Sequence, residues 1–284
     1  MRQVAVVTTG FFDGVHLGHR HVIETVVSSA RERGEEAVVV TFWPHPRTVL
    51  QQDARDFRIL NTLEEKKALL QGLGIDRIEV IPFTRDFAAL TAAQYLDLLI
   101  NKYQADVLVM GYNNTVGSDL KTAKDIDNVI VVDKIGDNTL SSTVIRKKLA
   151  EGDVAGANEM LGYEYTMTGA VVAGNRMGRT IGFPTANLQL YEPLKLVPGN
   201  GVYAVEVEVL GRIYKGMCNI GTRPTVGGVS RTIETHILDF DQDIYGLPIT
   251  LRFRRRIRDE RKFASLEALR EQLTMDRREC SLIV

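Results

Sequence analysis

The chain has 284 residues, of which 44% are hydrophobic and 25% charged, and its formal net charge is −1. These values are typical of a globular protein of about two domains and exclude an intrinsically disordered chain. The near-neutral charge argues against broad electrostatic capture of nucleic acid or of an anionic membrane. Cys218 and Cys280 are far apart in sequence and outside any zinc-ligand spacing, so we expect neither a zinc site nor a disulfide scaffold.

The N-terminal stretch has one positive charge before a short apolar run that breaks at Gly10. This pattern predicts a first β-strand and not a signal peptide. No stretch of the sequence approaches the roughly 20 apolar residues that a membrane-spanning helix requires. We therefore expect a soluble, cytoplasmic protein without a membrane partner.

Strand patterns alternate with helical patterns over the first part of the chain. The expected strands are residues 4–9, 37–42, 77–83, 106–111 and 128–135, and the expected helices are residues 19–33, 63–73, 92–103 and 142–151. Such alternation predicts βαβ units on a parallel sheet. We expect a Rossmann-like α/β domain over residues 1–160, with its ligand at the carboxyl ends of the strands.

The pattern then changes to period-two alternation with tight turns, as at residues 202–221 and 249–257, and ends in one amphipathic helix at residues 265–280. This pattern predicts a small antiparallel β-barrel with a C-terminal helix over residues 161–284. Arginines at alternate positions from Arg252 to Arg258 indicate a solvated strand face. We expect no nucleic-acid partner, since aromatic residues are nearly absent from that face.

The first group of candidate site residues lies in the segment GFFDGVHLGH at residues 10–19, between the first strand and the first helix. Backbone N–H groups and the positive end of a helix receive phosphate at such a position. His16 and His19 can point to the same side and donate hydrogen bonds to phosphate oxygens. Ser142 lies at a later helix start, and Arg146 in the first turn is suited to bind a departing pyrophosphate. The combination predicts a nucleotidyltransferase domain that works by stabilising charge.

The second group lies in the glycine-rich segment 174–187 and in the strand that contains Glu234. The segment is no Walker loop, but its glycines can cradle phosphates. Thr185 and Asn187 offer oxygen ligands for Mg²⁺ bridged to ATP. Glu234 shares a strand face with Leu238 by alternation, so we expect it to face inward and to act as a general base.

With these segments the sequence resembles the bacterial bifunctional riboflavin kinase/FMN adenylyltransferase family, also called FAD synthetase, over essentially its whole length. The matching segments occur in family order: GFFDGVHLGH at 10–19, TFWPHPR at 41–47, GYNNTVG at 111–117, SSTVIR at 141–146, GRTIGFPTAN at 178–187, GVYAV at 201–205, NIGTRPT at 219–225, IETHILDF at 233–240, DIYG at 243–246 and RDERKF at 258–263. The resemblance implies that the C-terminal domain phosphorylates riboflavin to FMN. It also implies that the N-terminal domain joins AMP from ATP to FMN, which gives FAD and pyrophosphate.

The resemblance also implies site residues. Its adenylyltransferase ATP site consists of Gly10, Phe12, Asp13, His16, Gly18, His19, Asn113, Ser142, Thr143 and Arg146, with His16, His19 and Arg146 as catalytic residues. Its kinase ATP site consists of Gly178, Arg179, Gly182, Pro184, Thr185 and Asn187, with Mg²⁺ on Thr185 and Asn187. Glu234 would take the proton of the ribityl 5′-hydroxyl, and the flavin would lie near Arg223, Arg261 and Phe263. The implied partners are ATP, riboflavin and FMN, and we expect a monomer or a weak homo-oligomer.

Two departures from the family leave alternatives open. The family has aromatic residues in the 111–117 loop, where this chain has Asn114 and Val116, and a longer stretch before the SST segment. We therefore expect part of a substrate loop or of the sheet edge to be missing. The alternatives are a riboflavin kinase with a degenerate adenylyltransferase domain, a nucleotidyltransferase for another phosphate acceptor, and a flavin-binding regulator.

Overall fold

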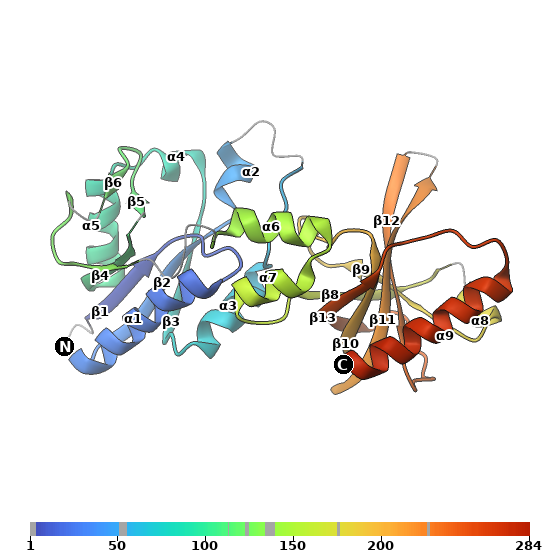
Figure 1. The fold of residues 1–284 in the computed structure, drawn as a ribbon. Coiled ribbons are helices and arrows are strands. Elements are labelled where there is room, and N and C mark those ends of the chain that lie inside the picture. The colour runs from blue at the N-terminus through green and yellow to red at the C-terminus, as the bar shows by residue number, and fades with distance from the viewer. Residues whose placement is uncertain are drawn as a thin grey trace. The chain divides into compact units, whose positions relative to one another are not determined.

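The computed structural model describes residues 4–50, 56–112, 114–122, 125–133, 140–174, 177–225 and 228–284. It contains two compact units, one that ends at Ser142 and one that runs from Thr143 to Val284 (Figure 1). The predicted domain boundary after residue 160 stays a prediction. Two helices, α6 (Ser142–Glu151) and α7 (Val154–Leu161), occupy the intervening sequence.

The first unit is built on a parallel sheet of five strands in the order β3-β2-β1-β4-β7 (Figure 1). The strands are β1 (Ala5–Thr9), β2 (Glu36–Trp43), β3 (Arg77–Pro82), β4 (Ala105–Gly111) and β7 (Val129–Val132). The chain order reverses between β1 and β4, and ligands of such sheets bind at this point, outside the carboxyl ends of the strands. The predicted Rossmann-like sheet is confirmed.

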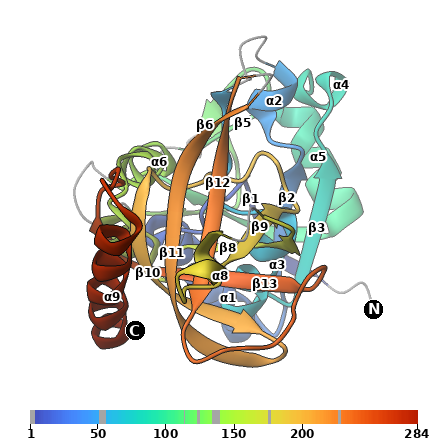
Figure 2. The same cartoon turned by 90° about the vertical axis from the view of Figure 1, so that its right-hand side faces the viewer.

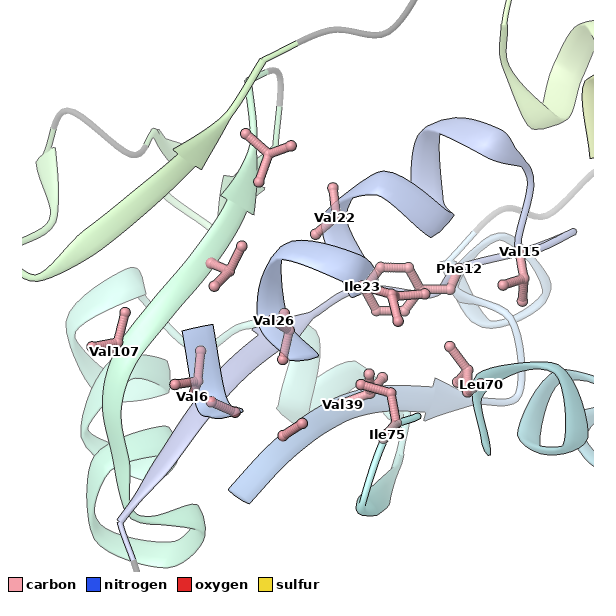
Figure 3. Close-up of a cluster of buried hydrophobic side chains, with 14 residues drawn as sticks. Val6, Phe12, Val15, Val22, Ile23, Val26, Val39, Leu70, Ile75 and Val107 are labelled. Carbon is pink, nitrogen blue, oxygen red and sulfur yellow. The ribbon is translucent and has the colours of Figure 1, made fainter. Parts of the chain in front are cut away.

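Helices cover both faces of this sheet. On one face α1 (Leu17–Arg33) and α3 (Leu63–Gly72) pack Ile23, Val26 and Leu70 against the strands (Figure 3). On the other face α5 (Ala92–Tyr103) contributes Tyr95 and Leu99 to a second core. Capping boxes at the first residues of α3 and α5 satisfy backbone donors that a helix start leaves unpaired.

Several short elements lie near the carboxyl ends of the strands and were not predicted. They are α2 (Pro46–Leu50), α4 (Arg85–Ala88) and a hairpin of β5 (Thr115–Val116) and β6 (Lys121–Thr122). Val116 is buried in the core of the α5 face, and the turn at Gly117 has φ 75° with no room for a Cβ atom beside Ala92. The predicted strand over residues 128–135 is present as the four-residue β7, which pairs with β4 at the edge of the sheet. The expectation that part of a substrate loop or of the sheet edge is missing relative to the family stays a prediction.

The second unit contains a closed barrel of six antiparallel strands in the order β10-β11-β12-β9-β8-β13 (Figure 2). The strands are β8 (Thr166–Val172), β9 (Ala186–Leu190), β10 (Gly201–Val209), β11 (Arg212–Thr225), β12 (Gly228–Ile237) and β13 (Pro248–Arg258). Buried residues that alternate along the strands, such as Tyr203, Leu251 and Phe253, fill the interior. The predicted barrel is confirmed.

The C-terminal helix α9 (Leu266–Ile283) lies along the outside of the barrel (Figure 2). Its Cys280 packs against Val202, Ala204 and Met217, which point outward from β10 and β11. Cys218 and Cys280 are both buried free thiols. Within the described residues, none of the helices combines the length and the apolar character needed to cross a bilayer.

Candidate active sites

A tight turn, residues 10–16, joins β1 to α1 and is called here the phosphate loop. Phe12 and Val15 have φ values of 54° and 36°, which non-glycine residues seldom adopt. Their side chains are buried in the core below the loop (Figure 3). The Phe12 ring therefore supports the loop from the core, and only the backbone of Phe12 is available to a ligand.

The two histidines lie side by side at the start of α1. His16 is the N-cap of the helix: its Nδ1 atom accepts a hydrogen bond of 3.4 Å from the His19 N–H. The two rings stack with their centroids 3.7 Å apart, so the prediction that they point to the same side is confirmed. Within the described part of the chain, the buried Nδ1 atom of His19 has no hydrogen-bond partner.

Burial keeps both imidazoles neutral at neutral pH. It lowers the pKa of His16 to about 4. The pKa of His19 is lowered well below its ordinary value, first by burial and then by the positive charges of His16 and Lys66. A neutral imidazole still donates one N–H, and an anionic phosphate placed beside these rings would raise their pKa again.

Asp13 anchors the phosphate loop on two sides. Its carboxylate accepts hydrogen bonds from the N–H groups of Leu60 (2.9 Å) and Asn61 (3.3 Å). Its carbonyl accepts one from the Ser142 hydroxyl at 2.8 Å, so Ser142 and the loop are brought together as predicted. The Asp13 carboxylate thus accepts hydrogen bonds from the backbone and holds the loop in place.

The other residues of the predicted adenylyltransferase set lie in different surroundings. Gly18 packs close to the His16 ring. Thr143 and Arg146 belong to α6 in the second compact unit, where Thr143 is exposed and Arg146 half-buried. Asn113 lies outside the described residues.

Two residues beside the phosphate loop were not predicted. The His45 ring packs against the Phe11 ring, with 4.1 Å between centroids. The Nζ atom of Lys66, on α3, donates a 2.9 Å hydrogen bond to the Phe11 carbonyl. The sequence held one clue to Lys66: it interrupts the apolar stripe of α3 between Leu63 and Leu70.

A cavity of about 440 Å³ opens at the carboxyl ends of the strands in the first unit, and we call it the aromatic pocket. Its lining includes Thr9, Gly10, Phe42, Phe83, Phe87, Tyr95, Val116 and Leu120. The Tyr95 hydroxyl shares a 2.5 Å hydrogen bond with the Thr9 hydroxyl at its inner end. The rings contact one another edge to face or tilted, so the walls are apolar and suit a flat aromatic ligand.

In the barrel, three polar side chains form a row across neighbouring strands. Glu234 on β12 lies directly opposite Asn187 on β9 and Asn219 on β11. A Cβ atom at Gly174 would lie 2.2 Å from the Asn187 amide nitrogen, so a larger residue there would displace the Asn187 side chain. Thr185, two residues before Asn187, completes a set of oxygen atoms that fits Mg²⁺ in its chemistry.

The direction of Glu234 differs from the expectation. Ile233, Thr235 and Ile237 are the β12 residues that point into the barrel. Glu234 therefore faces outward with Leu238, toward the layer that α9 covers. The prediction that Glu234 shares a face with Leu238 is confirmed. The prediction that it faces inward is wrong: the outer face of β12 is itself half-buried, so its apolar residues resemble those of an inner face.

Two cavities of the barrel share Thr185 as a wall. The loop pocket, of about 350 Å³, is lined by Arg179, Pro184, Thr185 and several residues of the 240–245 segment. The α9 pocket, of about 310 Å³, is lined by Gly178, Phe183, Thr185, Asn219, Glu234, His236, Arg258, Arg261, Phe263 and Leu273, among others. The structure thus brings together Thr185, Glu234, Arg261 and Phe263, as the sequence predicted.

The remaining predicted kinase residues are placed as follows. Gly182 has φ 84°, a conformation that favours glycine. Gly178 approaches the Phe183 carbonyl so closely that a Cβ atom would lie 2.2 Å from it. The side chain of Arg223 lies outside the described part of the structure.

His236 is a pocket residue that was not predicted. It is two residues after Glu234 on the same strand face, and its Nδ1 atom lies 2.8 Å from the Pro184 carbonyl. Burial lowers its pKa, so the ring is neutral and fixes the glycine-rich segment against β12. The spacing from Glu234 was the available signal.

An α/β unit with a phosphate loop, followed by a barrel with two adjoining pockets, defines a two-domain nucleotide-dependent transferase. Family models agree: the FAD synthetase model matches residues 1–144 and the riboflavin kinase model residues 161–284. The chain belongs to the bifunctional riboflavin kinase/FMN adenylyltransferase family.

Relatives of that name support the assignment along the whole chain. The Bacillus subtilis protein is 40% identical over 97% of this chain and 91% of its own length, and the Escherichia coli K12 protein is 38% identical over 97% and 91%. A crystal structure described as a macrolide-efflux protein from Streptococcus pneumoniae is 36% identical, covers 99% of this chain and 95% of its own, and has a TM-score of 0.94. Because both halves match, a degenerate N-terminal domain or a flavin-binding regulator is not favoured.

Proposed function

We propose that this chain makes FMN and FAD in two ATP-dependent transfers, one in each domain, with the boundary after residue 160. The C-terminal domain moves the γ-phosphoryl group of ATP to the ribityl 5′-hydroxyl of riboflavin. The N-terminal domain moves AMP from ATP to the phosphate of FMN and releases pyrophosphate. The observation that carries the kinase assignment is that Thr185 lines both barrel pockets, so the two pockets adjoin. Phosphoryl transfer requires such a neighbourhood, because the γ-phosphate of the donor and the hydroxyl of the acceptor must meet in line.

In the kinase reaction, ATP occupies the loop pocket and riboflavin the α9 pocket. Glu234 takes the proton of the 5′-hydroxyl as its oxygen bonds to the γ-phosphorus and ADP leaves. Thr185 and Asn187 would hold Mg²⁺, which when bound would supply positive charge to the ATP phosphates. No group of three His, Cys, Asp or Glu that could hold a metal occurs among the described residues.

In the flavin part of the α9 pocket, Phe263 and Arg261 bind the ring system. The Arg261 guanidinium lies 4.9 Å from the centre of the Phe263 ring. A stacked arginine and an aromatic ring together form a flat surface suited to isoalloxazine. The family resemblance assigns Arg223 to the flavin site as well, and we assign Gly178, Arg179, Gly182 and Pro184 to the ATP site.

In the adenylyl transfer, the FMN phosphate attacks the α-phosphorus of ATP. It is already largely ionised at neutral pH, because the second pKa of a phosphate monoester is about 6, so charge stabilisation matters more than a base. His16, His19 and the N-terminus of α1 donate to the phosphate oxygens, and Arg146 binds the pyrophosphate. Gly10, Gly18, Ser142, Thr143 and Asn113 complete the ATP site, with Phe12 and Asp13 as supports.

The flavin of FMN lies in the aromatic pocket during that step. Gly10 belongs both to the wall of this pocket and to the phosphate loop. A flavin seated there therefore has its phosphate near the loop. The flat apolar walls match the isoalloxazine ring.

We further propose that the chain works in the cytoplasm as a monomer or weak homo-oligomer, without nucleic acid. The arginines of β13 pair within the second unit: Arg252 with Glu208, Arg254 with Glu206, and Arg258 with Asp276. Such pairing leaves little free positive charge for phosphodiester backbones. Light scattering after size exclusion tests the oligomeric state.

Separation of flavins after incubation with riboflavin and Mg-ATP tests the function. We expect FMN first and FAD later. In Glu234→Gln we expect FMN formation to fall about 10²- to 10⁴-fold, with riboflavin binding retained and supplied FMN still converted to FAD. Glu271→Gln, the same change at an exposed residue of α9, serves as control. A Glu234→Gln chain that phosphorylates riboflavin normally contradicts the proposed base.

A further inference from the structure

Lys66 is the feature of the first unit that the reaction scheme has not yet used. It lies on the inner face of α3, and its side chain is 1% exposed. Leu70, one turn further along the same face, packs into the core with Phe12 and Val15. A lysine at such a core position is rare unless its charge has a task.

The ammonium group of Lys66 is bound to the backbone of the phosphate loop. Its Nζ atom lies 2.9 Å from the Phe11 carbonyl and 3.0 Å from the Thr41 hydroxyl oxygen. The Thr41 hydroxyl also donates to the same carbonyl at 3.2 Å. Nζ is 3.8 Å from the centre of the Phe11 ring, so both the backbone and the side chain of Phe11 are held by Lys66.

This arrangement costs stability. The acceptors are the Phe11 carbonyl, the Thr41 hydroxyl and, at 3.5 Å, the Phe42 carbonyl. None of them carries a charge, and burial of an ammonium group among neutral acceptors is unfavourable. Burial lowers the pKa of Lys66 to about 8, and the nearby Asp13 carboxylate offsets part of the effect. Lys66 is therefore still cationic at neutral pH, behind a loop that receives anionic phosphates.

The segment that Lys66 holds is strained. Phe11 is followed at once by Phe12 with φ 54° and, three residues later, by Val15 with φ 36°. Such backbone persists only where surrounding contacts hold it. The Asp13 carboxylate fixes the loop to the backbone of residues 60 and 61. The Lys66 ammonium fixes it to α3 through the Phe11 carbonyl.

We propose that Lys66 is a positioning residue for adenylyl transfer, whose buried ammonium holds the Phe11 carbonyl and so keeps the phosphate loop in its ATP-binding shape. The proposal rests on the proposed adenylyltransferase function of the first unit. Lys66 acts through the loop and does not touch substrate. Its positive charge also acts on His19, whose pKa it lowers.

The test compares three variants of the full chain: Lys66→Met, Lys66→Arg and Lys67→Met. Lys67→Met is the matched control for Lys66→Met. Lys67 neighbours Lys66 on the same helix and is only half-buried. Three quantities are measured for each variant: kcat and KM for ATP in FAD formation from FMN, the rate of riboflavin phosphorylation, and the thermal transition of Trp43 fluorescence. Trp43 is the single tryptophan and lies on β2, so it reports on the first unit.

We expect Lys66→Met to lower kcat/KM for ATP in FAD formation by about 10- to 100-fold, as for a misplaced binding group. Lys66→Arg should restore most of the loss. Riboflavin phosphorylation and the Trp43 transition should stay as in the wild type, since removal of a buried charge relieves its desolvation cost. Lys67→Met should match the wild type throughout.

Two results would overturn the role of Lys66. One is a Lys66→Met chain with wild-type FAD formation. The other is a loss of activity that follows a lower Trp43 transition and is equally severe in Lys66→Arg, because that loss is only structural. Failure of the proposed function looks different: the wild-type chain itself forms no FAD from FMN. In that case the role of Lys66 is tested by calorimetric measurement of ATP affinity. Equal ATP affinity of the wild type and Lys66→Met would overturn the role.

Discussion

The histidines of the phosphate loop are neutral when no ligand is bound, although the sequence motif alone suggests cationic phosphate binders. His16 caps α1 through its Nδ1 atom, and burial removes water from both rings. Without a ligand, His16 and His19 therefore carry no positive charge at neutral pH. Protonation is favoured only when phosphate arrives, since an adjacent anion stabilises the imidazolium form.

The pKa of His16 makes the stability of the first unit depend on pH. Folding lowers the pKa of His16 from 6.5 to about 4. Between these two pH values the unfolded chain binds more protons than the folded chain, so the free energy of unfolding falls as pH decreases from 6.5 toward 4. The full contribution of His16 is about 3 kcal/mol. We expect the Trp43 transition to shift to lower temperature over this range, and His16→Asn, which retains a capping acceptor, to shift less. Equal pH slopes in both chains would contradict this account.

Among the elements, α9 fixes one wall of the α9 pocket through a buried ion pair. The Asp276 carboxylate is 2% exposed and accepts three hydrogen bonds of 2.7–3.0 Å from the Arg258 guanidinium. Gln272 donates a fourth at 2.6 Å. Arg258 lines the pocket, so the position of the helix determines the position of a pocket residue.

Replacement of Asp276 by Asn should destabilise the contact between α9 and β13 by about 3 kcal/mol, because it leaves a buried guanidinium without its carboxylate. We expect faster hydrogen–deuterium exchange in α9 and β13 peptides and a higher KM for riboflavin. The matched control is Asp239→Asn, which removes the exposed pair of Arg277 on the same helix. Exposed pairs contribute roughly 0–1 kcal/mol. Similar exchange in both variants would contradict a special role for Asp276.

Periodicity was sufficient to predict the main elements. The five parallel strands lie where apolar runs of four to eight residues predicted them, and α5 has the predicted bounds. The short α2 and α4 were not predicted, since four or five residues carry no period. Helix α7 was not predicted, because its eight residues lie next to the domain boundary predicted after residue 160.

The sites were predicted less completely. Motifs located His16, Thr185 and Glu234, whereas contacts between distant segments were not visible in the sequence. Lys66 and Phe11 are 55 positions apart. The alternation rule placed Glu234 on the correct strand face, but it could not say which face of a closed barrel carries the pocket.

At the scale of the whole molecule, each of the three pockets described above is lined by residues of one compact unit. The two barrel pockets are lined by residues of the second unit, and the aromatic pocket by residues of the first. FMN made in one domain must therefore leave the α9 pocket before it is adenylylated. Nothing in this scheme requires both transfers to occur on the same chain.

Two defective variants should complement each other in solution. Glu234→Gln should convert FMN but not riboflavin to FAD, and a chain with His16 and His19 replaced by Asn should stop at FMN. We expect a mixture of the two to form FAD from riboflavin after a lag that shortens as protein concentration rises. The flavins are followed by chromatography. A mixture that stops at FMN would indicate that FMN is not released.

The burial of the two cysteines has a chemical consequence. Burial raises the pKa of both Cys218 and Cys280 to about 12, and the thiolate is the form that oxidants attack. Both sulfhydryl groups therefore remain in the thiol form at neutral pH and are enclosed by the fold, so we expect thiol-directed oxidants to react slowly with the folded chain.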